Sequence, residues 1–347
     1  MTNRRISKQI RIGDVVVGGE SPIAVQSMTN TDTRDVKSTV SQIQELEDAG
    51  CEIIRVAVPD MEAAAALSLI KKGIRIPLVA DIHFDYRLAL EAIKYVDGLR
   101  LNPGNIGNPD EVKKVVLSAK EREIPIRIGL NAGSLPKDLN PKLSTAKKLV
   151  VAATKQVDLL ESLDFDLIKI SLKAFDVPTT IAAYKEIARK IPYPLHVGIT
   201  EAGTPRAGMI RSSVGIGTLL YLGIGDTIRV SLTAPPAEEV FAGYEILKSL
   251  DLRERGPVLV SCPSCGRAEI NIISLAQKVE KALEKFKRPV KVAVMGCVVN
   301  GPGEAMDADV GIAGGKGKGI LFKKGRQIGV IQEKDFLTAL MDEVEKL

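Results

Sequence analysis

Short apolar runs rich in β-branched residues alternate with longer amphipathic runs eight times between Pro22 and Leu250. Runs of the first kind are typical of buried strands, and runs of the second kind are typical of helices. Eight such units in about 230 residues predict an α/β fold with a closed (β/α)8 TIM barrel, although a doubly wound open sheet uses the same alternation. We expect strands at Pro22–Met28, Cys51–Val58, Pro77–Ile82, Gly98–Asn102, Ile124–Asn131, Leu167–Lys173, Pro194–Thr200 and Thr227–Leu232. We expect helices at Arg34–Ala49, Met61–Lys72, Tyr86–Val96, Pro109–Arg122, Thr145–Leu163, Pro178–Lys190, Ser212–Leu222 and Ala237–Leu250.

After Gly256 the rhythm changes, and we expect a separate small α+β domain. Its expected elements are strands at Val258–Val260, Val290–Met295, Asp309–Ala313, Ile320–Lys323 and Ile328–Ile331, and helices at Glu269–Phe286 and Glu333–Leu347. We therefore divide the chain into a substrate-binding barrel over residues 1–252 and a second domain over residues 253–347, joined at Leu252–Gly256. A hairpin within Gln9–Gly19 is expected to plug the floor of the barrel.

The composition indicates the kind of hydrophobic core and excludes several classes of binding partner. Tryptophan is absent and aromatic residues make up only 4% of the chain, so the core must be aliphatic, as in proteins with buried parallel strands. The net charge is only +5, and no run of Lys and Arg carries interleaved aromatics, which argues against nucleic-acid binding. The polar start, Met1–Arg5, is no secretory signal, and no apolar run reaches membrane-spanning length. We expect a cytoplasmic protein with reduced thiols.

Charged side chains recur at a spacing of two within the expected strands. Every second side chain of a barrel strand points inward, and the C-terminal strand ends face the active site. The spacing places six cations in the middle or late part of these strands: Arg55, Arg100, Arg127, Lys169, Lys173 and Arg229. Pairing with buried acids would account for any one of them, but six together predict a cavity for a strongly anionic ligand with phosphate groups.

Polar residues near the same strand ends extend this candidate site. We expect them to contact the ligand, and they are Asn102, Asn105, Asn131, His196, Thr200 and Ser231; Asp81 and His83 are candidates to assist. A plain turn explains Asn102 and Asn105 equally well. The run Gly314–Gly319, which alternates glycine and lysine in its second half, lacks the spacing of a phosphate-binding P-loop, so we interpret it as a surface turn.

Three of the four cysteines and one glutamate form the most specific motif. Two residues separate Cys262 from Cys265, 31 separate Cys265 from Cys297, and six separate Cys297 from Glu304. A gap of two residues lets two thiolates bind one metal centre from a single turn, and a third thiolate leaves one position for a weaker ligand. Thiolates suit both zinc and iron–sulfur clusters, so the residues alone leave both open. Cys51, at the start of a barrel strand, is expected to be a core residue.

The residues alone therefore fit several functions. A zinc-stabilised, phosphate-binding barrel with aldol or lyase chemistry is one alternative, and a pure electron carrier with the barrel as scaffold is another. An electron carrier would leave the inward cations unexplained. An RNA-binding barrel would need a basic stripe on its outer surface, and the sequence shows none.

Several motifs resemble those of the 4-hydroxy-3-methylbut-2-enyl diphosphate synthases, an iron–sulfur enzyme family of the non-mevalonate isoprenoid pathway. They are Cys-Pro-Ser-Cys-Gly-Arg at 262–267, Met-Gly-Cys-Val-Val-Asn-Gly-Pro-Gly-Glu at 295–304, Gly-Ile-Gly-Asp-Thr-Ile-Arg-Val-Ser-Leu at 223–232, Arg-Leu-Asn-Pro-Gly-Asn at 100–105 and Ile-Thr-Glu-Ala-Gly at 199–203. The resemblance covers essentially the whole chain and fits the compact bacterial two-domain form.

The resemblance implies the reaction and the cofactor. The family reduces 2-C-methyl-D-erythritol 2,4-cyclodiphosphate with two electrons from flavodoxin or ferredoxin, opening the ring and expelling water. It implies one [4Fe-4S] cluster held by Cys262, Cys265, Cys297 and Glu304, and a homodimer in which one subunit's cluster domain caps the other's barrel. On this basis we expect Glu304 to be an exchangeable ligand with a catalytic role, and Glu201 to be the proton donor for loss of water.

Overall fold

The computed structural model describes residues 4–101, 108–299 and 301–347, and the side chains of Pro302 and Glu304 are not among the described parts. The chain divides into two units, Met1–Arg253 and Glu254–Leu347. In the first unit eight strands pair in parallel in the order β8-β7-β6-β5-β4-β3-β10-β9. A parallel bridge between Ile170 and Leu195 brings the two ends of this sheet together, so the predicted TIM barrel is confirmed.

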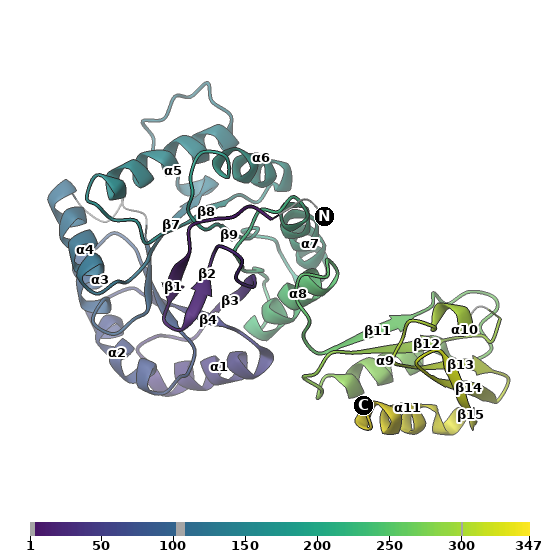
Figure 1. Cartoon of the computed structure of the whole chain (residues 1–347). Coiled ribbons are helices and arrows are strands. Elements are labelled where there is room, and N and C mark those ends of the chain that lie inside the picture. Colours follow the sequence, from purple (N-terminus) through teal and green to yellow (C-terminus); the bar gives the residue numbers. More distant parts are fainter. Residues whose placement is uncertain (1–3, 102–107, 300) are drawn as a thin grey trace. The chain divides into compact units, whose positions relative to one another are not determined.

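Each barrel strand is followed by a helix on the outside (Figure 1). The strands are β3 Ala24–Met28, β4 Ile53–Val58, β5 Leu78–Ile82, β6 Gly98–Leu101, β7 Ile126–Asn131, β8 Ile168–Lys173, β9 His196–Val197 and β10 Thr227–Ile228. The helices are α1 Val36–Ala49, α2 Met61–Lys72, α3 Tyr86–Ala92, α4 Pro109–Glu121, α5 Thr145–Glu161, α6 Val177–Ile187, α7 Pro205–Tyr221 and α8 Pro236–Lys248, with a short 3-10 turn at Ala132–Ser134. The first six helices begin after an Asp, Asn or Ser whose side chain accepts a backbone N–H bond, which fixes where each strand-to-helix loop ends.

A two-stranded antiparallel hairpin closes one end of the barrel. Strands β1 (Ile10–Ile12) and β2 (Val15–Val17) pair with each other and lie over the barrel in Figure 1. Their buried side chains pack against Ala24, Ile53 and Val79, which lie at or near the starts of their strands. The hairpin therefore plugs the N-terminal end, as the sequence predicted, and leaves the C-terminal strand ends to carry a site.

The second unit is a five-stranded sheet in the order β11-β12-β13-β14-β15, parallel over the first three strands and antiparallel over the last three. Its elements are β11 Pro257–Ser261, α9 Ile272–Leu283, β12 Val290–Met295, α10 Gly301–Glu304, β13 Val310–Gly315, β14 Lys318–Lys323, β15 Arg326–Gln332, a 3-10 turn at Glu333–Asp335 and α11 Phe336–Glu345. Helices α9 and α11 share one apolar core with the sheet. The predicted α+β character of this unit is confirmed.

Two barrel strands are much shorter than the sequence indicated. The expected strands Pro194–Thr200 and Thr227–Leu232 are reduced to two residues each, β9 and β10. Pro194 has no N–H to donate, and a Cβ at Gly198 would lie 2.4 Å from the carbonyl oxygen of Arg229, so backbone and side chains crowd here where a regular ladder was expected. No helix in the described part of the chain is long and apolar enough to cross a membrane.

Candidate functional site

The inward-facing side chains of the barrel form two layers of different character. Near the hairpin they are apolar, and toward the C-terminal strand ends they are mostly charged or polar. Pairing in register links the charged layer across three strands, because Asp81 lies beside Arg100 and Arg100 lies beside Arg127. The spacing of two along neighbouring parallel strands thus places a row of ionic groups on the inner face of the barrel.

These groups line a cavity of about 160 Å³ at the C-terminal end of the barrel. Its lining residues are Arg55, Asp81, His83, Arg100, Arg127, Asn131, Ser171, Lys173, Thr200, Arg229 and Ser231. Five of these side chains are Arg or Lys and one is a carboxylate, so the cavity suits an anion.

Asp81 is the anchor of the cations on one side. Its carboxylate lies 2.9 Å from Nη1 of Arg100 and 3.4 Å from Nε of Arg55. Burial opposes the ionisation of Asp81, but the charges of Arg55 and Arg100 outweigh it and hold its pKa below the usual value. Burial also lowers the pKa of His83; the charge of Asp81 opposes this shift, and the charges of Arg100 and Arg55 add to it.

Arg127 and Lys173 have no ion-pair partner among the described residues. Nη1 of Arg127 donates to Ser171 Oγ at 3.0 Å, while its buried Nε and Nη2 have no acceptor. Burial, followed by the charges of Arg229 and Arg127, holds the pKa of Lys173 well below its usual value. Unused donors in a polar cavity are what a bound anion would satisfy.

Two glycines make room for these cations. A Cβ at Gly129 would lie 2.4 Å from Nε of Arg100, and a Cβ at Gly198 would lie 2.9 Å from Nζ of Lys173. Contacts below 3 Å are not tolerated, so any side chain at either position would displace a cation that lines the cavity.

Several residues expected at this site lie elsewhere. Lys169 is buried beside its register partner Arg127 and lines a separate cavity of about 10 Å³ next to the floor hairpin, not the main one. His196 is also buried, with Nδ1 2.8 Å from Thr227 Oγ1, and does not line the main cavity. Glu201 is exposed and follows the lining residue Thr200, with its backbone at a φ of 56°. Asn102 and Asn105 lie outside the described residues.

One carboxylate that supports the site was not predicted from the sequence. Glu239, in the first turn of α8, is buried and lies 3.2 Å from Nη2 of Arg229. It also accepts the backbone N–H of Leu232 at 2.9 Å, so it holds both the cation and the loop after β10. The alternation of residues along a strand cannot predict a side chain that reaches the strand from a helix. The signal in the sequence was an acidic residue in the first turn of the helix that follows a βα loop.

The three predicted cysteines meet in the second unit. Because β11 and β12 are parallel neighbours, the loops after them leave the same edge of the sheet, one carrying Cys262 and the other Cys297. The backbone N–H of Gly296 donates to Cys262 Sγ at 3.2 Å and joins the two loops. A cavity of about 100 Å³ lies between them, lined by Cys262, Pro263, Cys265, Arg267, Met295, Cys297 and Gly301.

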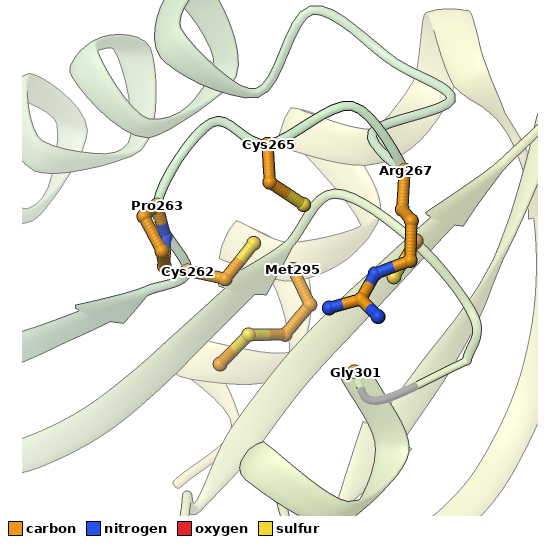
Figure 2. Close-up of a pocket in the computed structure, with 7 residues that line it drawn as sticks. Cys262, Pro263, Cys265, Arg267, Met295 and Gly301 are labelled. Atoms are coloured by element: carbon orange, nitrogen blue, oxygen red, sulfur yellow. The ribbon is translucent and has the colours of Figure 1, made fainter.

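The sulfurs surround this cavity instead of converging on a point. Figure 2 shows the side chains of Cys262 and Cys265 directed into it, with the guanidinium of Arg267 reaching toward it from another side. Among the described residues no three His, Cys, Asp or Glu are close enough to hold one metal ion. The backbone N–H of Arg267, and then its side chain, lower the pKa of the Cys265 thiol toward the thiolate that binds metals.

This donor set fits an iron–sulfur cluster, which is larger than a single ion and prefers thiolates. Arg267 was not predicted as a site residue, although it is the last residue of the Cys-Pro-Ser-Cys-Gly-Arg motif.

Glu304 ends α10, and its side chain is outside the described part. Cys51 is buried in the barrel core, where burial raises its pKa to about 12, so it is not available as a ligand. One unit thus offers an anion cavity and the other a thiol-lined cavity.

Comparison with known proteins gives matches to both units. The family model of the GcpE TIM-barrel domain matches residues 7–244, and that of the GcpE protein C-terminal domain matches residues 258–346. A protein of Dehalococcoides mccartyi named 4-hydroxy-3-methylbut-2-en-1-yl diphosphate synthase (flavodoxin) is 65% identical, with all of both chains covered. A protein of Geobacter sulfurreducens with the same name is 58% identical, with 98% of each chain covered.

Solved structures resemble the barrel. Dihydropteroate synthase from Stenotrophomonas maltophilia matches with a TM-score of 0.55 at 12% identity, covering 71% of this chain and 97% of that one. A type I 3-dehydroquinate dehydratase from Clostridium difficile matches with a TM-score of 0.51 at 15% identity, covering 70% and 98%. Likeness at such low identity supports the barrel fold alone.

Proposed function

The chain belongs to the GcpE family, and from this we propose that its barrel binds a cyclic diphosphate while its C-terminal unit supplies electrons to it. The reaction is the reductive conversion of 2-C-methyl-D-erythritol 2,4-cyclodiphosphate to 4-hydroxy-3-methylbut-2-enyl diphosphate in isoprenoid biosynthesis. It consumes two electrons and two protons, opens the ring at a carbon–oxygen bond to phosphate, and releases one water.

The cation-lined cavity is the observation that supports the substrate half of this proposal. Arg55, Arg100 and Arg127 present forked donors that suit phosphate oxygens, and Lys173 of β8 and Arg229, just after β10, add charge. Negative charge grows on the phosphate oxygen as the ring opens, and fixed cations stabilise that charge without reorganising. Asn131, Thr200 and Ser231 line the cavity and would orient the hydroxyl groups, while Lys169 and His196 are buried and do not line it.

The thiol-lined cavity supports the electron half. We assign Cys262, Cys265, Cys297 and Glu304 as the residues that would hold one [4Fe-4S] cluster, which when bound stores and passes single electrons. The residues around it serve that role: Gly296 donates to Cys262, and Arg267 places positive charge beside the thiols. Glu304 is the exchangeable ligand of this set.

Glu201 is our candidate proton donor for the hydroxyl that leaves as water. It follows Thr200 at the cavity wall, and its left-handed backbone is a conformation that costs about 1 kcal/mol or more for a non-glycine residue. Strained backbone of this kind often marks functional positions. A Glu201→Gln protein should bind substrate normally and turn over at least about a hundredfold more slowly; normal turnover would exclude the role.

Three further assignments complete the proposal. We expect flavodoxin or ferredoxin to supply the electrons, and the names of the relatives include flavodoxin. We expect a homodimer in which the cluster-bearing unit of one copy covers the barrel cavity of the other. All four cysteines are free, which suits a cytoplasmic enzyme in a reducing compartment.

Two cysteine variants test the proposal. Cys297→Ser, purified without oxygen, should lose the brown absorbance and the activity while still binding the cyclic diphosphate, because the barrel cavity is intact. Cys51→Ser is the matched control and should keep colour and activity. Full activity in Cys297→Ser, or loss of the cluster in Cys51→Ser, would refute the ligand assignment.

A further inference from the structure

A basic turn of the second unit has no role in the function above. It is the run Gly314–Gly319, which covers the end of β13, the turn at Lys316 and Gly317 and the start of β14. It carries Lys316 and Lys318. From residue 310 to residue 332 the sequence contains five Lys or Arg and no Asp or Glu. Lys323 pairs with Glu343 outside the segment, but the segment itself carries an excess of positive charge.

This turn is joined to the thiol loops by consecutive hydrogen bonds. The N–H of Lys316 donates to Glu269 Oε2 at 3.1 Å, and the N–H of Glu269 donates to the carbonyl of Gly296 at 2.8 Å. Gly296 in turn donates its N–H to Cys262 Sγ at 3.2 Å. Three short contacts therefore connect the basic turn to a cysteine of the cavity.

The turn also lies against exposed apolar residues. An added Cβ at Gly315 would lie 3.5 Å from Cγ1 of Val298, which directly follows Cys297. Val298 and Val299 are 41% and 71% exposed. Lys316 and Lys318 are exposed, and neither has an ion pair among the described residues. We call Val298, Val299, Lys316 and Lys318 the basic face.

We propose that the basic face is the docking surface for an acidic electron-carrier protein of the flavodoxin type, an inference that rests on the proposed function. Exposed apolar groups beside unpaired cations suit a transient contact in which charge guides the encounter. A second copy of this chain carries the same net charge of +5, so overall charge does not favour it as the partner. Each encounter oxidises the carrier by one electron, and two encounters supply the two electrons that the ring opening consumes.

A charge reversal tests this surface. In Lys316→Glu/Lys318→Glu we expect the KM for a purified, acidic, reduced flavodoxin to rise about tenfold or more, because steering of that size depends on charge. Turnover driven by photoreduced deazaflavin, which is small and needs no docking surface, should stay unchanged, as should iron and sulfide content. The control Lys278→Glu/Lys281→Glu changes the same charge on α9 and should leave the flavodoxin KM unchanged.

The contrary outcomes are distinct. An unchanged flavodoxin KM overturns the proposal, as does a rise of the same size in the control pair. A loss of deazaflavin-driven turnover with weaker substrate binding would assign the turn to the substrate, and would also overturn it. If the Lys316→Glu/Lys318→Glu protein loses its cluster, the milder Lys316→Gln/Lys318→Gln protein must still show a raised KM for flavodoxin. A wild-type protein inactive with both reductants would instead refute the proposed function itself.

Discussion

Arg127 lies in a position that the ligand-free protein does not favour. It is buried, two of its nitrogens lack acceptors, and burial together with the charges of Arg55 and Arg100 lowers its pKa well below the usual value. Burying a cation with incomplete partners costs stability. An anion in the cavity would place negative charge beside this buried cation and offset part of that cost, which would contribute to the affinity for the ligand.

Replacement of Arg127 should therefore move affinity and stability in opposite directions. We expect Arg127→Met to weaken binding of the cyclic diphosphate about tenfold to a hundredfold, the value of one or two charge-assisted hydrogen bonds. The free energy of unfolding of the ligand-free protein should rise by about 1–3 kcal/mol. Calorimetry and urea denaturation measure the two. Arg11→Met, on the exposed side of the floor hairpin, is the control, and unchanged affinity in Arg127→Met would contradict an anion cavity.

His196 makes stability depend on pH. Burial, and then the charges of Arg127, Lys173 and Lys169, hold its pKa well below the usual value of about 6.5. Below that pH the unfolded chain binds a proton at this residue that the folded chain does not, so stability falls as pH falls. In His196→Gln the fall between pH 6.5 and 5 should be shallower by up to about 1.4 kcal/mol per pH unit. Identical slopes in urea denaturation series would contradict this.

At the scale of elements, the barrel has its shortest described strands at β9 and β10, which are only two residues long. Tyr184 of α6 compensates: its hydroxyl donates to the carbonyl of His196 and accepts the N–H of Leu172 at 3.0 Å. Both partners are backbone groups, one on β8 and one on β9, so a helix side chain bridges the seam of the barrel.

Loss of this bridge should destabilise the barrel. We expect Tyr184→Phe to lower the free energy of unfolding by about 1–3 kcal/mol, because two buried backbone groups lose their partner. Urea denaturation followed by circular dichroism measures it. Tyr86→Phe removes a hydroxyl at the start of α3 and should change stability by less than about 0.5 kcal/mol. Equal effects from both variants would show that the seam does not depend on Tyr184.

The same elements show which features of the candidate site could be predicted from the sequence. Spacing of two predicted that Arg100, Arg127 and Lys173 face inward, because that period is fixed by the strand. It did not predict that Lys169, in phase with Lys173 but four residues earlier in β8, lines the floor cavity and not the main one. Glu239 and Tyr184 were missed because they reach the strands from helices, and helix orientation is set by tertiary packing.

At the scale of the whole molecule, the ionic groups and the thiols belong to different units. The cavity for the anion is built entirely within Met1–Arg253, and the cavity with the cysteines entirely within Glu254–Leu347. The motif spacing predicted that the three cysteines lie at one site. They do so because the two loops that carry them follow the neighbouring parallel strands β11 and β12. The spacing does not tell which copy's thiols serve which barrel.

Mixing two impaired variants answers that question. If the cluster-bearing unit of one copy serves the barrel of another, Cys297→Ser and Arg127→Ala proteins should together show more activity than the sum of the two alone, at a substrate concentration too low for Arg127→Ala to bind. A mixed dimer then contains one barrel and one thiol unit that are both intact and face each other. Co-expression with different affinity tags isolates the mixed dimer for assay. Activity no greater than the sum of the parents would assign both halves of a site to a single chain.

Spectroscopy of oxygen-free protein, with and without the cyclic diphosphate, tests the account most directly. We predict a brown protein containing iron and labile sulfide, whose electron paramagnetic resonance signal after reduction changes when the diphosphate is added. At the same ligand concentration the change should be smaller in Arg127→Met, since the barrel delivers the ligand. A colourless yet active preparation, or a signal indifferent to the diphosphate, would contradict the claim that cationic barrel and thiol-bound cluster act on one substrate.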